Sequence, residues 1–164
     1  MYKPTPEVLS AIRADAALLP EAAALQQAAA VESALAAPRP DLTEALLRLV
    51  RAGQDHGVAV SRQVTAAACR AACGALGQRH PGRAIEVRVP PFAAAQIGFG
   101  SGPTHTRGTP PNVAELAPAE FLRLVTGAIA WDEAAVSASG VHTSDAAIAF
   151  PFREFRRADP APTD

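Results

Sequence analysis

The sequence predicts an α+β fold in which helices precede a mostly antiparallel sheet. Apolar residues recur at helical spacing through roughly the first half of the chain, and the spacing then changes to the period of two that is typical of strands at Ile85, Val87 and Val89. One further helical pattern, after Pro118, stands among the later strands. Because strands and helices do not alternate regularly, this order disfavours a parallel doubly wound sheet.

Residues 1–57 are predicted to form a helical extension of three helices. Their boundaries are marked by cap residues and prolines, namely Thr5 with Pro6, Pro20, Pro38 with Pro40, and Asp41 with Glu44. Asp41 and Glu44 have the spacing of a capping box at the start of the third helix, which ends near Gly53. Each predicted helix carries one apolar face: Leu9, Ile12, Ala16 and Leu19; Leu25, Ala28, Val31 and Leu35; Leu42, Leu46, Leu49 and Val50.

Residues 58–155 are predicted to form the main α+β domain, and residues 156–164 a loose tail. An alanine-rich helix over residues 58–79 ends at the strong stop signal His80-Pro81-Gly82. A second helix follows Pro118, directs Phe121, Leu124 and Val125 inward and ends at Gly127, and a short turn lies near Trp131. Strands are predicted over residues 85–89, 93–99, 112–116, 136–139 and 146–150.

The composition favours a cytoplasmic protein that binds no nucleic acid. The 164 residues contain 15 basic and 16 acidic side chains, a formal net charge of -1, so there is no broad basic field to attract phosphates. Two cysteines are too few for the disulfide framework of a small secreted domain. No secretory signal is expected at the N-terminus, and no apolar run reaches the roughly 20 residues of a membrane helix, so no stable membrane insertion is expected.

The polar residues do not converge on a catalytic motif, and no cofactor or metal site is predicted. His105 and Arg107 lie in a polar loop where they would hold an anionic or polar head group, or else fix the loop through hydrogen bonds to its own backbone. Cys69 and Cys73 are one helical turn apart, and a zinc site would need a second ligand pair at recognisable spacing. Packing of both cysteines in a helix contact is the favoured interpretation.

A stretch rich in proline and glycine carries a family resemblance. Val-Arg-Val-Pro-Pro-Phe ends at Phe92, and Gly-Pro-x-His-Thr-Arg-Gly-Thr-Pro-Pro-Asn ends at Asn112. Together with the later Phe-Leu-x-Leu-Val-x-Gly, Trp131 and Val-Ser-Ala-Ser-Gly, these motifs resemble the actinobacterial sterol carrier family, the bacterial orthologues of sterol carrier protein. The resemblance covers about residues 80–140.

The resemblance implies a sterol-carrier-like fold, a curved antiparallel sheet covered by helices around an apolar tunnel. It implies a non-enzymatic carrier that binds an apolar small molecule or lipid in an apolar pocket between the sheet and the helices, beneath Phe121 and Trp131. The implied ligand contacts, each of which is also explained as plain core, are Phe92, Ile97, Phe99, Phe121, Leu124, Val125 and Trp131, with His105 and Arg107 near a polar head. The chain departs from the family in the short interval between Trp131 and Val136, and in its three alanines after Phe92.

Two alternatives remain beside the carrier hypothesis. One is an interaction or regulatory module that keeps the fold without a cavity and presents the stripes containing Leu25 and Leu46. The other is an enzyme, because sterol-carrier-like domains also occur beside the helical domain of thiol-dependent isomerases. Those domains use a histidine-rich metal site, and this chain has only His56 before His80.

Overall fold

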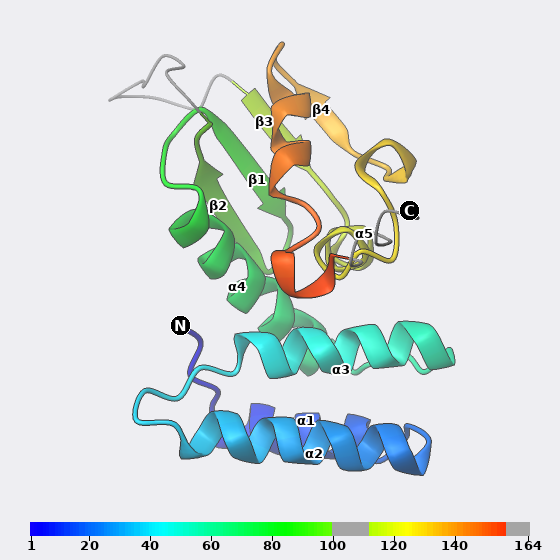
Figure 1. Ribbon diagram of the computed structural model, residues 1–164. Coiled ribbons are helices and arrows are strands. Elements are labelled where there is room, and N and C mark those ends of the chain that lie inside the picture. Colours follow the sequence, from blue (N-terminus) through cyan, green and yellow to red (C-terminus); the bar gives the residue numbers. More distant parts are fainter. Residues whose placement is uncertain (100–111, 157–164) are drawn as a thin grey trace, which may run out of the picture.

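The computed structural model describes residues 1–99 and 112–156 (Figure 1). Its α-helices are α1 (Pro6–Ala16), α2 (Glu21–Ala36), α3 (Thr43–His56), α4 (Arg62–Arg79) and α5 (Pro118–Val125). Its strands are β1 (Ile85–Val89), β2 (Ala93–Ile97), β3 (Asn112–Glu115) and β4 (Ser137–Ser139). Three short 3-10 helices complete the C-terminal part: η1 (Trp131–Glu133), η2 (Thr143–Ala149) and η3 (Arg153–Phe155). The predicted α+β class with N-terminal helices is confirmed.

The four strands form one sheet in the order β2-β1-β3-β4. The outer pairs, β1 with β2 and β3 with β4, are antiparallel, whereas the central pair, β1 with β3, is parallel. Val87 is opposite Ala95 on one side and Ala114 on the other. The sheet is therefore mostly antiparallel, as the sequence predicts, with a parallel pair at its centre.

The sheet buries one face against helices. Ile85, Val87 and Val89 are buried, while the intervening Glu86 and Arg88 are partly exposed, which is the predicted alternation. Helix α4 packs on β2, and α3 and α5 pack on α4. Buried alanines and cysteines along α4 allow these close contacts because they carry little side-chain bulk: Ala67, Ala68, Cys69, Ala72 and Cys73.

The N-terminal helices share the core of the main domain. Figure 1 shows α1 and α2 at the end of the molecule away from the sheet; α2 packs on α3, whereas α1 also packs directly on α4. The Asp15 carboxylate accepts a hydrogen bond of 2.7 Å from the Ser61 N–H, and Arg51 donates to the carbonyl of Thr126 at 2.9 Å. One hydrophobic cluster runs from α1 to the C-terminal segment, so the core is continuous across residue 57.

One predicted strand is wrong. Residues 146–150 were expected to form a strand, and the structure instead places Thr143–Ala149 in the 3-10 helix η2. Ala146 and Ala149, three positions apart, are buried, while Ile148 between them is 63% exposed. This period of three suits a 3-10 helix, and the Thr143 hydroxyl begins the turn by donating to the carbonyl of Ser139 at 2.7 Å.

The predicted capping box is also wrong in part. The Asp41 side chain does accept from the Thr43 N–H at 3.0 Å, but it also accepts from the Tyr2 N–H at 2.9 Å. Glu44 forms an ion pair with Arg48 one helical turn later and does not return to the start of the helix. The carboxylate of Asp41 therefore ties the N-terminus to α3 as well as capping it.

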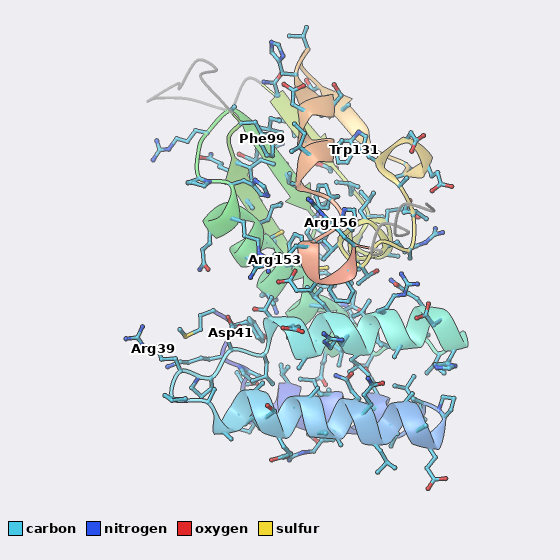
Figure 2. All side chains as sticks on the ribbon, viewed as in Figure 1. Arg39, Asp41, Phe99, Trp131, Arg153 and Arg156 are labelled. Atoms are coloured by element: carbon cyan, nitrogen blue, oxygen red, sulfur yellow. The ribbon has the colours of Figure 1, made fainter. Side chains whose placement is uncertain are left out.

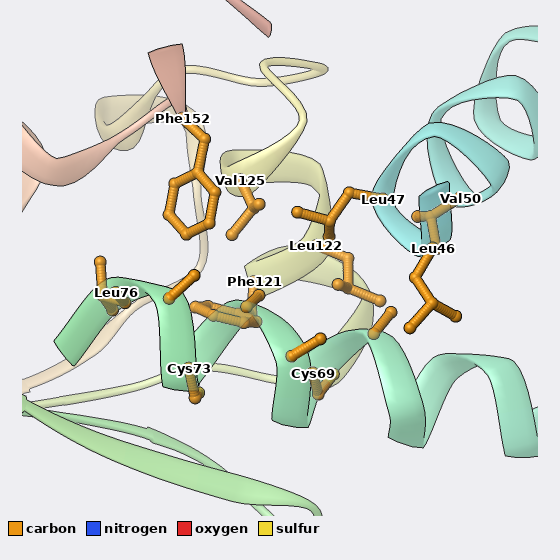
Figure 3. Close-up of a cluster of buried hydrophobic side chains, with 14 of the residues drawn as sticks. Leu46, Leu47, Val50, Cys69, Cys73, Leu76, Phe121, Leu122, Val125 and Phe152 are labelled. Atoms are coloured by element: carbon orange, nitrogen blue, oxygen red, sulfur yellow. The ribbon is translucent and has the colours of Figure 1, made fainter. Parts of the chain in front are cut away.

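The cysteines lie on α4 within the buried hydrophobic cluster (Figure 3). Both Cys69 and Cys73 are free thiols, and burial raises the pKa of each to about 12. In the part of the chain that the structure describes, no three His, Cys, Asp or Glu side chains gather as a metal site. Among the same residues, no helix has the length and apolar character needed to cross a membrane.

Candidate ligand-binding site

Helix α5 places the apolar residues that the sequence singled out on its buried face. Pro118 occupies the first turn, where its missing N–H costs no helical hydrogen bond. Phe121, Leu124 and Val125 follow at helical spacing, and none of them is exposed. These three side chains therefore form the floor of the candidate site, next to α4.

The C-terminal segment, residues 143–156, covers this floor. The ring of Phe150 meets Phe121 edge-on at 6.1 Å between centroids, and Trp131 stacks on Phe150 at 5.7 Å. The Phe152 N–H donates to the carbonyl of Val125 at 3.1 Å. Trp131 and Phe121 are thus brought together through Phe150, a residue that the sequence reasoning placed in a strand and did not assign to the site.

Phe152 is the second aromatic residue of the cover. Figure 3 shows its ring directed toward α4, near Leu76 and Val125. Only 2% of the residue is exposed. The guanidinium carbon of Arg79 lies 4.3 Å from the centroid of the same ring, so one face of Phe152 meets a cation and its edge meets the apolar core.

The remaining predicted contact residues do not join this cluster as one site. Phe92 lies in the turn after β1, beneath the guanidinium of Arg62 at 5.4 Å, and Phe99 lies beyond the other end of β2, 5.0 Å from the His80 ring. Ile97 is buried on the face of the sheet that α4 covers. His105 and Arg107 lie outside the described residues, so their predicted contact with a head group remains a prediction.

A pocket of about 420 Å³ opens beside the cover, at the C-terminal end of α4. We call it the basic pocket; its lining consists of Arg79, His80, Ala149, Pro151, Phe152, Arg153 and Arg156. Figure 2 shows Arg153 and Arg156 on the C-terminal segment. Ala149 and Phe152 belong both to this lining and to the buried cluster, so the pocket adjoins the apolar core at these two residues.

The charges around the basic pocket shift two pKa values. Burial lowers the pKa of His80, and the positive charges of Arg79 and Arg156 lower it further. Burial alone would raise the pKa of Glu154, but a backbone hydrogen bond and the neighbouring Arg79 and Arg153 lower it overall. Both shifts have the direction that a positive local potential produces.

A family model described as bacterial SCP ortholog, that is, sterol carrier protein ortholog, matches residues 61–152. The match covers more than half of the chain. The chain belongs to this bacterial sterol carrier protein family. No curated protein matches the chain.

The family match includes the apolar part of the candidate site but not all of the basic pocket. It spans α4, the sheet, α5, Trp131, Phe150 and Phe152, and so includes the whole apolar floor and two of the three aromatic residues of the cover. Arg153 and Arg156, which supply half of the basic side chains of the pocket, follow the match. The helices α1 to α3 precede it. The apolar floor of the site thus lies in the family region, whereas two of the basic side chains of the basic pocket, Arg153 and Arg156, lie outside it.

The basic pocket is the part of the site that sequence reasoning missed. Arg79 ends a helix and its partner Glu154 comes 75 positions later, so no local spacing connects them. The signal that could have found the pocket is the run Phe-Arg-Glu-Phe-Arg at residues 152–156, in which charged and aromatic residues are interleaved. That run was assigned to the end of the domain and to the loose tail.

Proposed function

We propose that this protein is a non-enzymatic carrier that binds an apolar ligand, such as a lipid or a sterol, between α5 and the C-terminal segment. The observation that carries the proposal is the aromatic stack of Trp131 and Phe150 over Phe121, which lies entirely within the region matched by the sterol carrier family. Such rings can be exchanged for an acyl chain or a sterol at little net loss of buried apolar area. The low cysteine content favours a cytoplasmic location for this carrier.

Entry of a ligand requires the cover to move, because Phe121, Leu124 and Val125 are fully buried. The cover is suited to local opening. It contains 3-10 turns, and within the described residues two backbone hydrogen bonds outside regular elements join residues 143–156 to the remaining chain: the one from Phe152 to Val125, and the turn bond from Asp145 to the neighbouring His142. Segments held by few backbone bonds open at a lower free energy than the helices and strands of the core.

The ligand is expected to replace Phe150 first. This ring is 9% exposed, whereas Phe121 beneath it is completely buried, so Phe150 is the outer of the two. Its displacement would leave a space bounded by Trp131 on the outside and Phe121 on the inside. The proposed site is therefore made partly by the protein in its closed form and partly by the movement of one side chain.

Displacement of a pyrene-labelled fatty acid by unlabelled dodecanoic acid tests this proposal. We expect saturable binding of one fatty acid per chain, and tighter binding by the Phe150→Ala variant because the ligand no longer has to displace the ring. Leu25→Ala is the matched control, because Leu25 lines a separate apolar groove of about 380 Å³ between α1 and α2. Absence of binding by the wild-type protein, or weakening by Leu25→Ala with no effect of Phe150→Ala, would reject the proposed site.

A second candidate function is an interaction module that uses the N-terminal helices. The observation that favours it is the exposure of Leu18 and Leu25, each 64% exposed near the groove between α1 and α2. Leu46, by contrast, is fully buried and belongs to the core. Sedimentation velocity over a range of protein concentrations tests whether the protein self-associates. A mass that stays monomeric at every concentration counts against this function. A mass that increases with concentration in the wild type, but not in the double variant Leu18→Ser with Leu25→Ser, supports it.

A further inference from the structure

The basic pocket collects positive charge from two distant parts of the chain. Arg79 and His80 come from the end of α4, and Arg153 and Arg156 come from the C-terminal segment. None of the described residues that line the pocket is an aspartate or a glutamate. The pocket is therefore a concave surface with one sign of charge, and such surfaces concentrate anions.

One nearby carboxylate only partly balances these charges. Glu154 accepts hydrogen bonds from both terminal nitrogens of Arg79, and one of its oxygens lies 3.8 Å from the Nε of Arg153. Thus, among the described residues, this carboxylate contacts two of the three guanidinium groups that line the pocket, those of Arg79 and Arg153. The pKa of His80 is lowered first by burial and then by the positive charges of Arg79 and Arg156.

The two arginines of the C-terminal segment have donors available to a ligand. The Arg153 side chain is 86% exposed, and its closest carboxylate contact is the one at 3.8 Å from Glu154. Arg156 donates through Nε to the carbonyl of Pro151 at 3.4 Å, and within residues 1–99 and 112–156 its terminal nitrogens make no hydrogen bond. A guanidinium group presents paired donors that match the two oxygens of a carboxylate or phosphate.

Part of the lining of the same pocket is apolar. It consists of Ala149, Pro151 and Phe152, and Ala149 and Phe152 also belong to the buried cluster that contains Phe121 and Val125. A ligand that extends from the arginines past Phe152 would place its polar end in the basic pocket and its apolar end on the floor of α5. An amphipathic anion has this combination of groups.

We infer that the basic pocket binds an oxyanion, a carboxylate or a phosphate, through Arg153 and Arg156, and that this oxyanion is the head group of the apolar ligand carried under the C-terminal segment. The second half of the inference rests on the proposed function. The first half does not, because an oxyanion can occupy the pocket while the cover stays closed.

Inorganic phosphate tests the oxyanion site alone. The imidazole signals of His80 are followed by NMR during a phosphate titration of the full chain and of two double variants. Arg153→Gln with Arg156→Gln removes the two charges from the pocket, and Arg39→Gln with Arg70→Gln removes two exposed charges elsewhere as the matched control. We expect a saturable shift in the wild type and the control, and at least about tenfold weaker binding in the pocket variant. No saturable shift, or equal affinity in all three proteins, overturns the site.

Dodecanoic acid and dodecanol identify the source of the oxyanion. They share the apolar chain and differ in the charged head, so only the acid should lose affinity in the pocket variant, again by at least about tenfold, while the alcohol binds all three proteins alike. Equal binding of the acid to all three proteins overturns the head-group half and leaves the carrier function standing. Phosphate binding without binding of either twelve-carbon ligand supports a free phosphate as the occupant and rejects the carrier function.

Discussion

The guanidinium group of Arg79 lies over the ring of Phe152, and the distance from the guanidinium carbon to the ring centroid is 4.3 Å. This contact connects the end of α4 to the segment that covers α5. Glu154, two positions after Phe152, accepts hydrogen bonds from the same guanidinium. One side chain of the helix thus holds the cover through a ring and through a carboxylate. We expect changes on either side of this contact to alter both stability and ligand access.

Truncation of Phe152 should destabilise the protein strongly. The Phe152→Ala variant loses a ring that is 2% exposed and leaves a cavity beside Leu76 and Val125, so we expect a loss of about 3–5 kcal/mol in the free energy of unfolding. Phe152→Leu fills most of the space and should lose clearly less. Urea denaturation measures both variants, and a loss below about 1 kcal/mol for the alanine variant would contradict the packing described.

The ion pair between Arg79 and Glu154 should make stability depend on acid pH. Despite the opposing effect of burial, the folded-state pKa of Glu154 is lowered from 4.5, so the unfolded chain takes up this proton more readily. The contribution of Glu154 is therefore present above about pH 4.5 and is lost as the pH falls through the lowered value.

Urea denaturation of the wild type and Glu154→Gln at several pH values tests this dependence. The excess stability of the wild type should shrink as the pH falls from about 6 to about 3, because protonation removes the same charge that the substitution removes. Arg79→Gln should give a similar convergence. A stability difference that stays constant across this pH range is inconsistent with the ion pair.

The imidazole of His80 should titrate below its ordinary value of 6.5. Burial and then the charges of Arg79 and Arg156 lower its pKa, so Arg156→Gln should raise the pKa measured by NMR, whereas Arg39→Gln, which changes an arginine outside the pocket, should leave it in place. The stability contributed by neutral His80 is present above pH 6.5 and is lost as the pH falls toward the lowered folded value. An unchanged pKa in Arg156→Gln would show that the two groups are not close.

A close backbone approach at the edge of the sheet should make Gly98 intolerant of alanine. A Cβ at Gly98 would lie 2.8 Å from the Cα of Gly82, and backbone atoms cannot move aside as a flexible side chain can. We expect Gly98→Ala to lose about 1–3 kcal/mol of stability. Gly74→Ala is the control, because nothing lies within 4 Å of its added Cβ in the middle of α4, and alanine there should stabilise by about 1 kcal/mol. Equal effects of the two substitutions would argue against the close approach.

Local signals were sufficient for most of the fold. Thr5 caps α1 as its spacing predicts, with its hydroxyl 3.4 Å from the Val8 N–H, and the alternation at Ile85 to Val89 identifies β1. The strand predicted at residues 146–150 failed because a short apolar run fits periods of two and three almost equally well. Tertiary contacts favour the 3-10 helix here, because it buries both Ala146 and Ala149 in the core and leaves Ile148 exposed.

The candidate site was predictable only in its apolar half. Phe121, Leu124 and Val125 follow from helical spacing on one short helix, and Trp131 follows from the family resemblance. The rest of the site depends on how the C-terminal segment returns across α5. This return brings Phe150 into contact with Phe121 and places Arg153 and Arg156 in the same pocket as Arg79. That return is a long-range feature of the packed chain, so residue spacing does not reveal it.

The emission of Trp131 gives the most direct test of the central claim, because it is the only tryptophan in the chain and it stacks on the ring that a ligand must displace. We expect a saturable change in this emission when dodecanoic acid is added below its micelle concentration, with one acid bound per chain. In the Phe150→Ala variant the half-saturation point should move to lower concentration. Emission that does not change up to the solubility limit, in protein shown by circular dichroism to be folded, would contradict ligand binding beneath the C-terminal segment.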